Sequence, residues 1–410
     1  MILLDSLGPY REGRALSTIT RLRAEGFDRD LVSAAVTQSR LRTAAAEKFG
    51  EFAAHMLFTQ AGLEQATRMQ VSAVHAQRFL EAGIRSVADL GCGIGGDAMA
   101  MAGLGLDVVA IERDQITAAV ATVNLMPFPN AQVLCDDVHS LDLQDLPGGA
   151  PQGLWLDPAR RTDDTPVSAE SRRIFDPEAF SPPLSFVKEL AATGTPMGVK
   201  LGPGIPHSAI DNDCEAQWVS HQGDVVEVVL WFNALARPGV RRSALVLHHD
   251  GTRHELTSST DFPDVAAQSE HQERAAPAVQ SGTVLWEPDG AVIRAGLVQD
   301  LGDQLGAQVI HPRIAYLVGP PAEPGTATTP FARAYRVREV LPHTIKVLKT
   351  WIKAHNIGTL DIKKRGTDVT PEQLRAQLKP SGPHKATLIL TRMVTDKGER
   401  RVVLVVDPLK

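Results

Sequence analysis

The hydrophobic and polar positions form two patterns along the first 250 residues. Up to about residue 80, apolar residues recur with helical spacing, as in the stretches 30–36 and 69–79, and few turn signals interrupt them. From residue 81 to about 250, short apolar runs alternate with helical stretches, which is typical of a parallel sheet with crossover helices. We therefore predict a helical N-terminal extension followed by an α/β domain.

Five apolar runs of the second region are predicted as buried strands, because they are short, continuous and bounded by turn residues or acids. The predicted strands lie at residues 87–90, 107–112, 131–138, 153–156 and 197–201, and helices are predicted over 115–120 and 184–192. Two further runs, 225–232 and 242–248, resemble the strand pair that closes the seven-stranded sheet of a known enzyme family, and this resemblance implies that they pair.

The segment 87–97, Val-Ala-Asp-Leu-Gly-Cys-Gly-Ile-Gly-Gly-Asp, joins the first strand to a helix through a glycine turn. Gly91 and Gly93 permit a sharp turn and a close approach of a ligand, because glycine has no Cβ. A helix that begins near Gly95 or Gly96 directs free N–H groups at the turn. The segment therefore predicts a site for a nucleotide-like ligand.

Two kinds of cofactor, a dinucleotide and S-adenosylmethionine, are considered as the ligand of this turn. Gly91, Gly93 and Gly96 satisfy the dinucleotide pattern G-x-G-x-x-G, and Glu112 follows at roughly the separation that this pattern expects. Asp89 favours S-adenosylmethionine (SAM), because a carboxylate at the strand end attracts the ammonium group of SAM and repels a pyrophosphate. A dinucleotide-dependent oxidoreductase is therefore the weakest alternative.

The stretch Asp89–Gly95 closely resembles motif I of the class I SAM-dependent methyltransferases, D-x-G-x-G-x-G. The resemblance implies that SAM is the cofactor, that Glu112 holds the ribose hydroxyls, and that an acid after the third strand lies near the adenine amino group. Asp137 is favoured for that acid, and Asp136 is the alternative. The predicted cofactor-binding residues are Asp89, Gly91, Gly93, Gly95, Asp97, Glu112 and Asp137.

The fourth predicted strand ends at Asp157-Pro158, which resembles motif IV of the amino-methylating members, Asp/Asn-Pro-Pro followed by an aromatic residue. Those enzymes use the acid or amide and a carbonyl fixed by proline to hold an amine in line with the S–CH₃ bond. Asp157 and Pro158 are therefore the predicted catalytic residues. This chain departs from the pattern at Ala159 and Arg160, and Arg160 and Arg161 are predicted to hold RNA phosphate or to stack on a base.

Length and composition indicate a globular protein of two to three domains, with 410 residues, 43% hydrophobic and 22% charged. The chain has no run of about 18 apolar residues and no apolar signal core after its N-terminus, so no membrane segment is predicted. Cys92, Cys135 and Cys214 are widely spaced, which suits reduced thiols in the cytoplasm rather than a disulfide framework or a zinc site.

The charge is unevenly distributed. Residues 331–410 contain 17 Lys and Arg against 7 Asp and Glu, a net charge of +10, whereas the whole chain carries −6. The preceding 330 residues therefore carry −16, from 25 basic and 41 acidic residues. A basic C-terminal region attached to an acidic body predicts an anionic partner, and nucleic acid is the obvious candidate.

The basic region has its own pattern of elements. An apolar stripe around Leu348 and Ile352 predicts a helix whose lysines at 346, 349 and 353 share another face. A strand then leads into the basic turn 363–366, a helix begins at Thr370-Pro371, and two apolar strands follow.

This order of elements resembles the THUMP-like domain at the C-terminus of some bacterial methyltransferases. THUMP domains proper are RNA-binding modules of tRNA-modifying enzymes, so the resemblance implies RNA as partner. Lys363, Lys364 and Arg365 are the residues predicted to bind it.

These observations identify the chain as a member of the bacterial class I SAM-dependent methyltransferases, distantly similar in motifs I to IV to the RNA cap guanine-N2 methyltransferases. The expected fold is α/β, a Rossmann-like seven-stranded core with an N-terminal helical extension and a small basic α/β C-terminal domain. The predicted domains are 1–80, 81–250 for SAM binding, 251–335 of unknown role, and 336–410.

The predicted reaction is direct transfer of a methyl group to a base nitrogen of RNA, tRNA or rRNA, with no metal. Two alternatives stay open beside it. A small-molecule or protein methyltransferase would keep the SAM site without using the basic tail. A non-catalytic RNA-binding protein with a SAM fold would bind RNA and transfer nothing.

Overall fold

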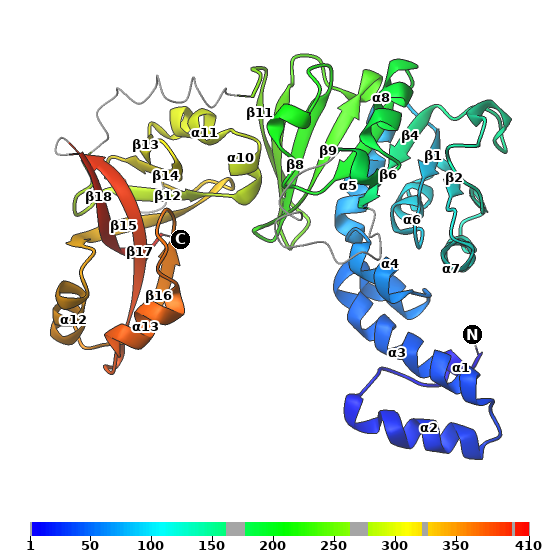
Figure 1. Ribbon diagram of the computed structural model, residues 1–410, viewed down its shortest axis with the longest axis horizontal. Helices are drawn as coiled ribbons and strands as arrows, with labels where there is room; N and C mark the ends of the chain where they lie inside the picture. The colour runs from blue at the N-terminus through cyan, green and yellow to red at the C-terminus, as the bar shows by residue number, and fades with distance from the viewer. Residues whose placement is uncertain (1, 161–176, 263–277, 322–326, 396–397, 410) are drawn as a thin grey trace. The chain divides into compact units, whose positions relative to one another are not determined.

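The computed structural model describes residues 2–160, 177–262, 278–321, 327–395 and 398–409 (Figure 1). The chain divides into two compact units. Unit 1 comprises Met1–Leu201, Ser208–Cys214 and Val229–Arg237, and unit 2 comprises Gly202–His207, Glu215–Val228 and Pro238–Lys410.

Unit 1 begins with the helical region that the apolar spacing predicts. Its elements are α1 (Ile2–Asp5), η1 (Glu12–Arg14), α2 (Ala15–Ala24), α3 (Arg29–Phe49), η2 (Gly50–Ala54), α4 (Gln60–Gln65) and α5 (Met69–Glu81). Asp28 begins the long helix α3, because its side chain accepts from the backbone N–H groups of Asp30 and Leu31. The buried residues of α3 recur at spacings of two to four positions and end at Phe49, so one face of the helix packs into the core.

The largest sheet has nine strands. They are β1 (Ser86–Leu90), β2 (Asp107–Ile111), β3 (Ala131–Leu134), β4 (Gly153–Leu156), β7 (Met197–Leu201), β8 (Glu215–His221), β9 (Asp224–Phe232), β10 (Arg242–Leu247) and β11 (Arg253–Ser258). Their order is β11-β10-β8-β9-β7-β4-β1-β2-β3. From β3 to β7 all neighbours are parallel. The direction of strand succession reverses between β1 and β4, and in such sheets ligands bind at the carboxyl ends of the strands at this point.

The helices α6 (Gly96–Gly103), α7 (Gln115–Leu125) and α8 (Leu184–Ala192) connect the parallel strands. Trp155 of β4 and Trp231 of β9 are fully buried, with ring centroids 5.9 Å apart. A Cβ at Gly198 of β7 would lie 2.6 Å from Trp231 and 2.8 Å from Trp155, so only glycine fits between them. In the described ranges no helix is long and apolar enough to cross a membrane.

The short elements of the first sheet's connections complete this part of the chain. They are η3 (Leu143–Asp145), β5 (Ala159–Arg160), η5 (Pro177–Ala179), β6 (Phe180–Ser181), η6 (His207–Ala209) and η7 (Asn233–Leu235).

Strand β8 is the main departure from the predicted sheet. It lies between β9 and β10, so the two runs expected to pair are not neighbours. All seven residues of β8 are buried although four of them are polar or charged. Gln217 of β8 donates to Glu255 Oε1 of β11 at 2.5 Å, so a buried polar side chain of β8 is hydrogen-bonded to another strand of the sheet. Because β8 contains four polar or charged residues, it is not an apolar run, and the hydrophobic pattern does not predict it.

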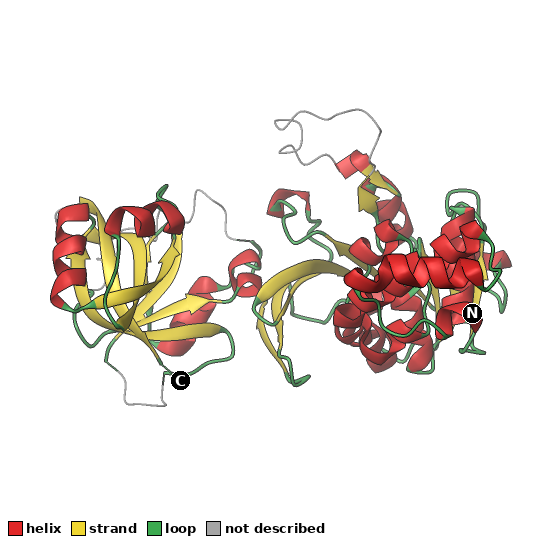
Figure 2. Ribbon diagram, turned by 90° about the horizontal axis from the view of Figure 1, so that it is seen from below, coloured by secondary structure: helices red, strands yellow, loops and turns green. Residues whose placement is uncertain are grey.

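Unit 2 contains a second sheet of seven strands. They are β12 (Val284–Pro288), β13 (Gln308–His311), β14 (Ile314–Gly319), β15 (Ala332–Pro342), β16 (Ile357–Lys364), β17 (His384–Thr395) and β18 (Gly398–Pro408), in the order β13-β14-β12-β15-β18-β17-β16. The strands curve strongly (Figure 2). Its helices are α10 (Gly290–Arg294), α11 (Val298–Leu305), α12 (Ile345–Ala354) and α13 (Pro371–Leu378).

Alternate residues of β17 and β18 point to opposite faces of this second sheet. Leu388 and Val403 belong to the core that α12 and α13 cover, whereas Ile389 and Leu404 belong to a core with β12 to β14. Both faces are therefore buried, which explains the continuous apolar runs in the sequence. The predicted start of α13 is confirmed, since the Thr370 side chain accepts from the N–H of Gln373 in a capping box.

Candidate active site

The glycine turn between β1 and α6 adopts left-handed backbone angles, which glycine permits. Gly91, Gly93 and Gly95 have φ values of 96°, 56° and 84°, a region that L residues with a Cβ rarely adopt. A Cβ at Gly91 or Gly93 would meet no atom within 4 Å among the described residues. The turn therefore leaves open space beside its backbone, and α6 begins at Gly96 as predicted.

Asp89 lies in β1 directly before this turn. Its side chain is 1% exposed, and its Oδ2 atom has no hydrogen-bond partner among the described residues. Burial and the nearby carboxylates of Asp97 and Asp157 raise the pKa of Asp89 well above its usual value. A buried carboxylate with a free oxygen is suited to bind a cationic group, because that contact would offset the cost of burying its charge.

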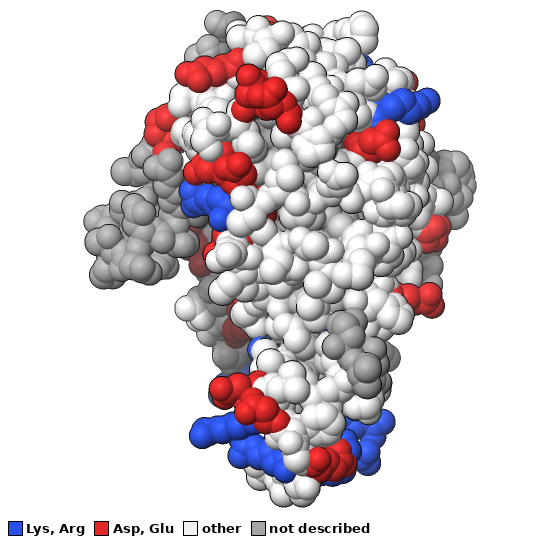
Figure 3. Space-filling model, turned by 90° about the vertical axis from the view of Figure 1, so that its right-hand side faces the viewer, with Lys and Arg blue, Asp and Glu red and all other residues white. Residues whose placement is uncertain are grey.

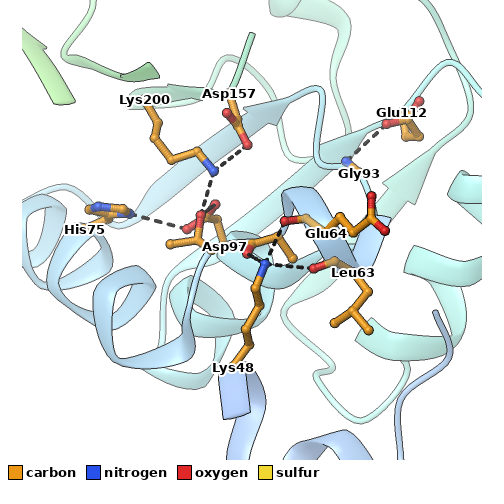
Figure 4. A network of polar contacts seen from close by, with 11 residues as sticks. Lys48, Leu63, Glu64, His75, Gly93, Asp97, Glu112, Asp157 and Lys200 are labelled. Atoms are coloured by element: carbon orange, nitrogen blue, oxygen red, sulfur yellow. Dashed lines mark hydrogen bonds and ion pairs between the residues drawn. The ribbon is translucent and has the colours of Figure 1, made fainter. Parts of the chain in front are cut away.

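Glu112 follows β2 and is hydrogen-bonded to the glycine turn. Its Oε2 atom accepts from the N–H of Gly93 at 3.1 Å, and its Oε1 atom accepts from the N–H of Asp114 at 2.8 Å (Figure 4). The carboxylate is therefore held at the carboxyl end of β2, next to the glycine turn.

Asp97 occupies the first turn of α6 and is buried with two polar partners. Its Oδ1 lies 3.3 Å from Nδ1 of His75, and its Oδ2 accepts from the Thr67 hydroxyl at 3.2 Å (Figure 4). Burial alone would raise the pKa of Asp97, but the hydrogen bond with His75 and the charge of Lys200 outweigh it and hold the pKa well below its usual range.

Lys200 is the buried cation at the centre of the site. The register of β4 against β7 pairs Leu156 with Val199, so Asp157 and Lys200 leave adjacent strand ends side by side. The Lys200 Nζ atom lies 2.5 Å from Asp157 Oδ2 and donates to the Thr67 hydroxyl at 2.6 Å (Figure 4). The ammonium therefore joins the predicted catalytic acid to Thr67, which lies between α4 and α5 and donates to Asp97 of α6.

Lys48 connects helix α3 to the segment that carries Thr67. Its Nζ atom donates to the backbone carbonyls of Leu63, Glu64 and Ala66, each at 2.8 Å. Burial and the charge of Arg68 lower the pKa of Lys48. The three carbonyls lie at the end of α4, immediately before Thr67, so Lys48 of α3 holds the segment that supplies a hydroxyl to the site.

We expect Lys48→Met to destabilise unit 1 by about 2–3 kcal/mol, because hydrogen bonds from a charged donor stabilise by that amount and three carbonyls lose their partner. The measurement is urea unfolding monitored by circular dichroism. Lys188→Met is the control, because the Lys188–Asp211 pair at 2.8 Å is exposed and such pairs contribute less than about 1 kcal/mol. Equal midpoints for the two variants would contradict the role of Lys48.

The remaining predicted site residues of unit 1 lie as follows. Asp137 is partly exposed. Its carboxylate accepts from the backbone N–H of His139 at 3.0 Å and lies 2.7 Å from His139 Nδ1, and these bonds lower the pKa of Asp137. Pro158 is buried. Arg160 lies in β5, where it pairs with Phe180 of β6, and Arg161 falls outside the described residues.

Lys363, Lys364 and Arg365 belong to unit 2, at the end of β16. Lys363 Nζ lies 2.7 Å from Glu287 Oε2, and Arg365 lies 3.8 Å from Glu287 Oε1. Burial lowers the pKa of Lys363, but the hydrogen bonds with Glu287 and Tyr335 outweigh it and raise that pKa. Lys364 is exposed. Two of the three residues therefore have an acidic partner within their own unit.

Four residues of the site are not among the residues predicted to bind or react, namely Lys48, Thr67, His75 and Lys200. Thr67 precedes α5, which begins after Arg68 without a side-chain cap, and the Thr67 hydroxyl contacts Lys200 and Asp97. The signal available for Lys200 is its place at the carboxyl end of the fifth predicted strand. In the described part of the chain, no group of His, Cys, Asp or Glu is arranged to hold a metal ion.

Comparison with known proteins decides the family. The chain is 30% identical over 368 residues to an uncharacterized S-adenosylmethionine-dependent methyltransferase of Mycobacterium tuberculosis, found in the strains CDC 1551 and H37Rv, with 87% of this chain and 92% of the relative covered. The chain belongs to the S-adenosylmethionine-dependent methyltransferases. SAM is therefore its methyl donor, and Asp89 with its free oxygen and the open space beside Gly91 and Gly93 fit that cofactor.

Two further comparisons bear on the architecture of this methyltransferase. A crystal structure assigned as a methyltransferase from Porphyromonas gingivalis W83 superposes with a TM-score of 0.71 at 20% identity, covering 98% of this chain and 100% of the other, which confirms the class I fold. Residues 332–408 match the family model described as THUMP domain-like, which confirms the predicted C-terminal resemblance, and residues 2–45 match a domain of unknown function.

We expect SAM binding to release a proton from Asp89. The raised pKa leaves this carboxyl protonated below that value, whereas an ammonium beside it favours the ionised form. SAM affinity should therefore rise with pH, by up to about tenfold per unit, until the pH reaches the pKa of free Asp89. Calorimetry between pH 5 and 7 in two buffers of different ionisation enthalpy measures the released proton. Release that persists in Asp89→Asn would assign the proton to another group.

Proposed function

We propose that this methyltransferase transfers the methyl group of SAM to a base nitrogen of RNA, either tRNA or rRNA. The observation that carries the proposal is the charge separation, +10 in residues 331–410 and −16 in the rest. The basic part coincides with the match to the THUMP domain-like model, and the resemblance to THUMP domains implies RNA. On the face of unit 1 that Figure 3 shows, Lys and Arg lie beside Asp and Glu at the lower end, and uncharged residues occupy much of the middle.

The cofactor side of the proposal rests on the carboxyl ends of β1, β2 and β3. We assign the ammonium of SAM to Asp89, the turn contacts to Gly91, Gly93 and Gly95, and the ribose hydroxyls to Glu112. Asp137 remains the proposed partner of the adenine amino group, at the carboxyl end of β3. Asp97 is proposed to position His75 and Thr67 beside the cofactor, since its carboxylate already has these two residues as partners.

The acceptor side rests on Asp157 and Pro158. When bound, SAM would supply its sulfonium methyl group to a nitrogen lone pair, with S-adenosylhomocysteine as the leaving group and loss of one proton from the methylated nitrogen. Asp157 would accept a hydrogen bond from the acceptor N–H, and the carbonyl of Pro158 a second one, so that the lone pair points at the methyl group. Lys200 holds the Asp157 carboxylate at 2.5 Å and so limits its orientation. Arg160 and Arg161 are the proposed contacts to the RNA beside this acid.

The division into residues 1–80, 81–250, 251–335 and 336–410 is part of the proposal, and so is a cytoplasmic location. The pairing of β12 with β15 places residues 284–288 in the same sheet as the C-terminal strands. Removal of residues 331–410 would take away strands that β12 to β14 need, so substitutions test the role of the basic region better than truncation.

The proposed function is tested with methyl-tritiated SAM and cell extract that lacks this protein, fractionated into RNA, protein and small molecules. We expect label in the RNA fraction, removed by RNase and absent with Asp157→Ala. Nucleoside analysis then names the base and atom. Label confined to protein or small molecules would replace RNA by that substrate class, and no label in any fraction would contradict the proposal.

A further inference from the structure

One face of helix α12 is a row of lysines without acidic partners. Lys346, Lys349 and Lys353 lie three and four residues apart, so their side chains share a face of the helix. All three are exposed, and no ion pair or hydrogen bond of their ammonium groups occurs among the described residues. Helix α12 contains no Asp or Glu. Its free positive charge is therefore concentrated along about 10 Å of helix.

The helix is fixed by a different face. Leu348 and Ile352 are 0% and 5% exposed and pack with α13 and the strands β16 to β18. On the flank of the helix, Trp351 Nε1 donates to Glu339 at 3.1 Å, which ties α12 to β15. The backbone that carries the lysines is therefore rigidly placed, and only the lysine side chains themselves have to be ordered by a partner.

The basic turn after β16 is different, although the sequence made it the more obvious phosphate site. Glu287 of β12 lies 2.7 Å from Lys363 and also accepts from the Tyr335 hydroxyl at 3.1 Å. The ring of Tyr316 lies 5.2 Å beneath the Arg365 guanidinium. These contacts join β16 to β12, β14 and β15. Lys363 and Arg365 are therefore largely committed to the second sheet, and their charge is partly neutralised.

We infer that the lysine face of α12, Lys346, Lys349 and Lys353, is the surface of the C-terminal domain that contacts the phosphate backbone of RNA. The inference rests on the proposed function, since it assumes that the substrate is RNA. A lysine row offers point charges to successive phosphates without reading bases. It therefore supplies affinity and orientation, and the choice of the base stays with the site in unit 1.

The test uses the full-length protein and a fluorescein-labelled, mixed-sequence single-stranded RNA of 20 nucleotides. Fluorescence anisotropy gives the dissociation constant at several KCl concentrations. The variant is Lys346→Gln, Lys349→Gln and Lys353→Gln together. The control removes three other positive charges from the same domain, by Arg338→Gln, Arg400→Gln and Arg401→Gln. Circular dichroism establishes that both variants are folded.

We expect the α12 variant to bind the RNA roughly 10- to 50-fold more weakly at 0.15 M KCl and to lower the salt slope by about 2, because each phosphate contact with a single strand contributes about 0.7 to that slope. The control should change the dissociation constant by less than about threefold, because its arginines would neutralise no phosphate. Equal losses in both variants, or an unchanged α12 variant, would overturn the inference. If the wild-type protein binds no RNA, the proposed function fails instead.

Discussion

Asp89→Ala is expected to weaken the binding of SAM by about 10- to 150-fold, the equivalent of the roughly 1.5–3 kcal/mol of a charge-assisted hydrogen bond. The side chain is 1% exposed and its Oδ2 atom is without a partner among the described residues, so this oxygen is available to a cationic group of a ligand. Calorimetric titration with SAM and S-adenosylhomocysteine measures the loss. Both ligands carry the ammonium, so both should be affected.

Two matched variants sharpen this test. Asp89→Asn keeps the shape and an oxygen acceptor, so a similar loss would show that the charge is required. Asp107→Asn is the control, because Asp107 is an exposed acid at the amino end of β2, at the opposite edge of the sheet. Undiminished SAM affinity in Asp89→Ala would contradict the assignment of the ammonium site, and NAD binding in preference to SAM would contradict the cofactor assignment as a whole.

Asp157→Ala is expected to reduce methyl transfer to RNA by about 100- to 1,000-fold while SAM affinity changes little, because orientation of the acceptor supplies a large part of the rate in a direct transfer. Single-turnover transfer from tritiated SAM measures the rate, and calorimetry measures SAM binding. Asp157→Asn should retain more activity than Asp157→Ala, since the amide oxygen still accepts a hydrogen bond from the acceptor amine.

The control for this prediction is Asp145→Ala, which removes an exposed acid of η3 and should leave both measurements unchanged. Lys200→Arg and Lys200→Met separate positioning from chemistry. The arginine variant keeps a cation beside Asp157 and should retain more transfer than the methionine variant. An Asp157→Ala enzyme that methylates RNA at the wild-type rate would rule out the catalytic role of this acid.

Much of the fold of both units follows from local sequence. The glycine turn, the start of α6, the parallel strands up to β7 and the capping box at Thr370 are each set by residues within a few positions of one another. The backbone freedom of glycine, helical periodicity and capping all act over such short separations, which is why these elements are predictable. The strand β8 is not, because its buried polar residues are satisfied only by residues on neighbouring strands.

The sequence by itself therefore determined that the chain has a SAM-type glycine turn with acids at the ends of successive strands, and that its C-terminal region is basic. The tertiary structure decided which charges are already paired. It brought Lys200 to Thr67, 133 residues away, and Lys363 to Glu287, 76 residues away, while it left Asp89 and the lysines of α12 without such partners among the described residues. These pairings depend on strand order and register, which bring distant side chains together, and no local spacing in the sequence specifies them.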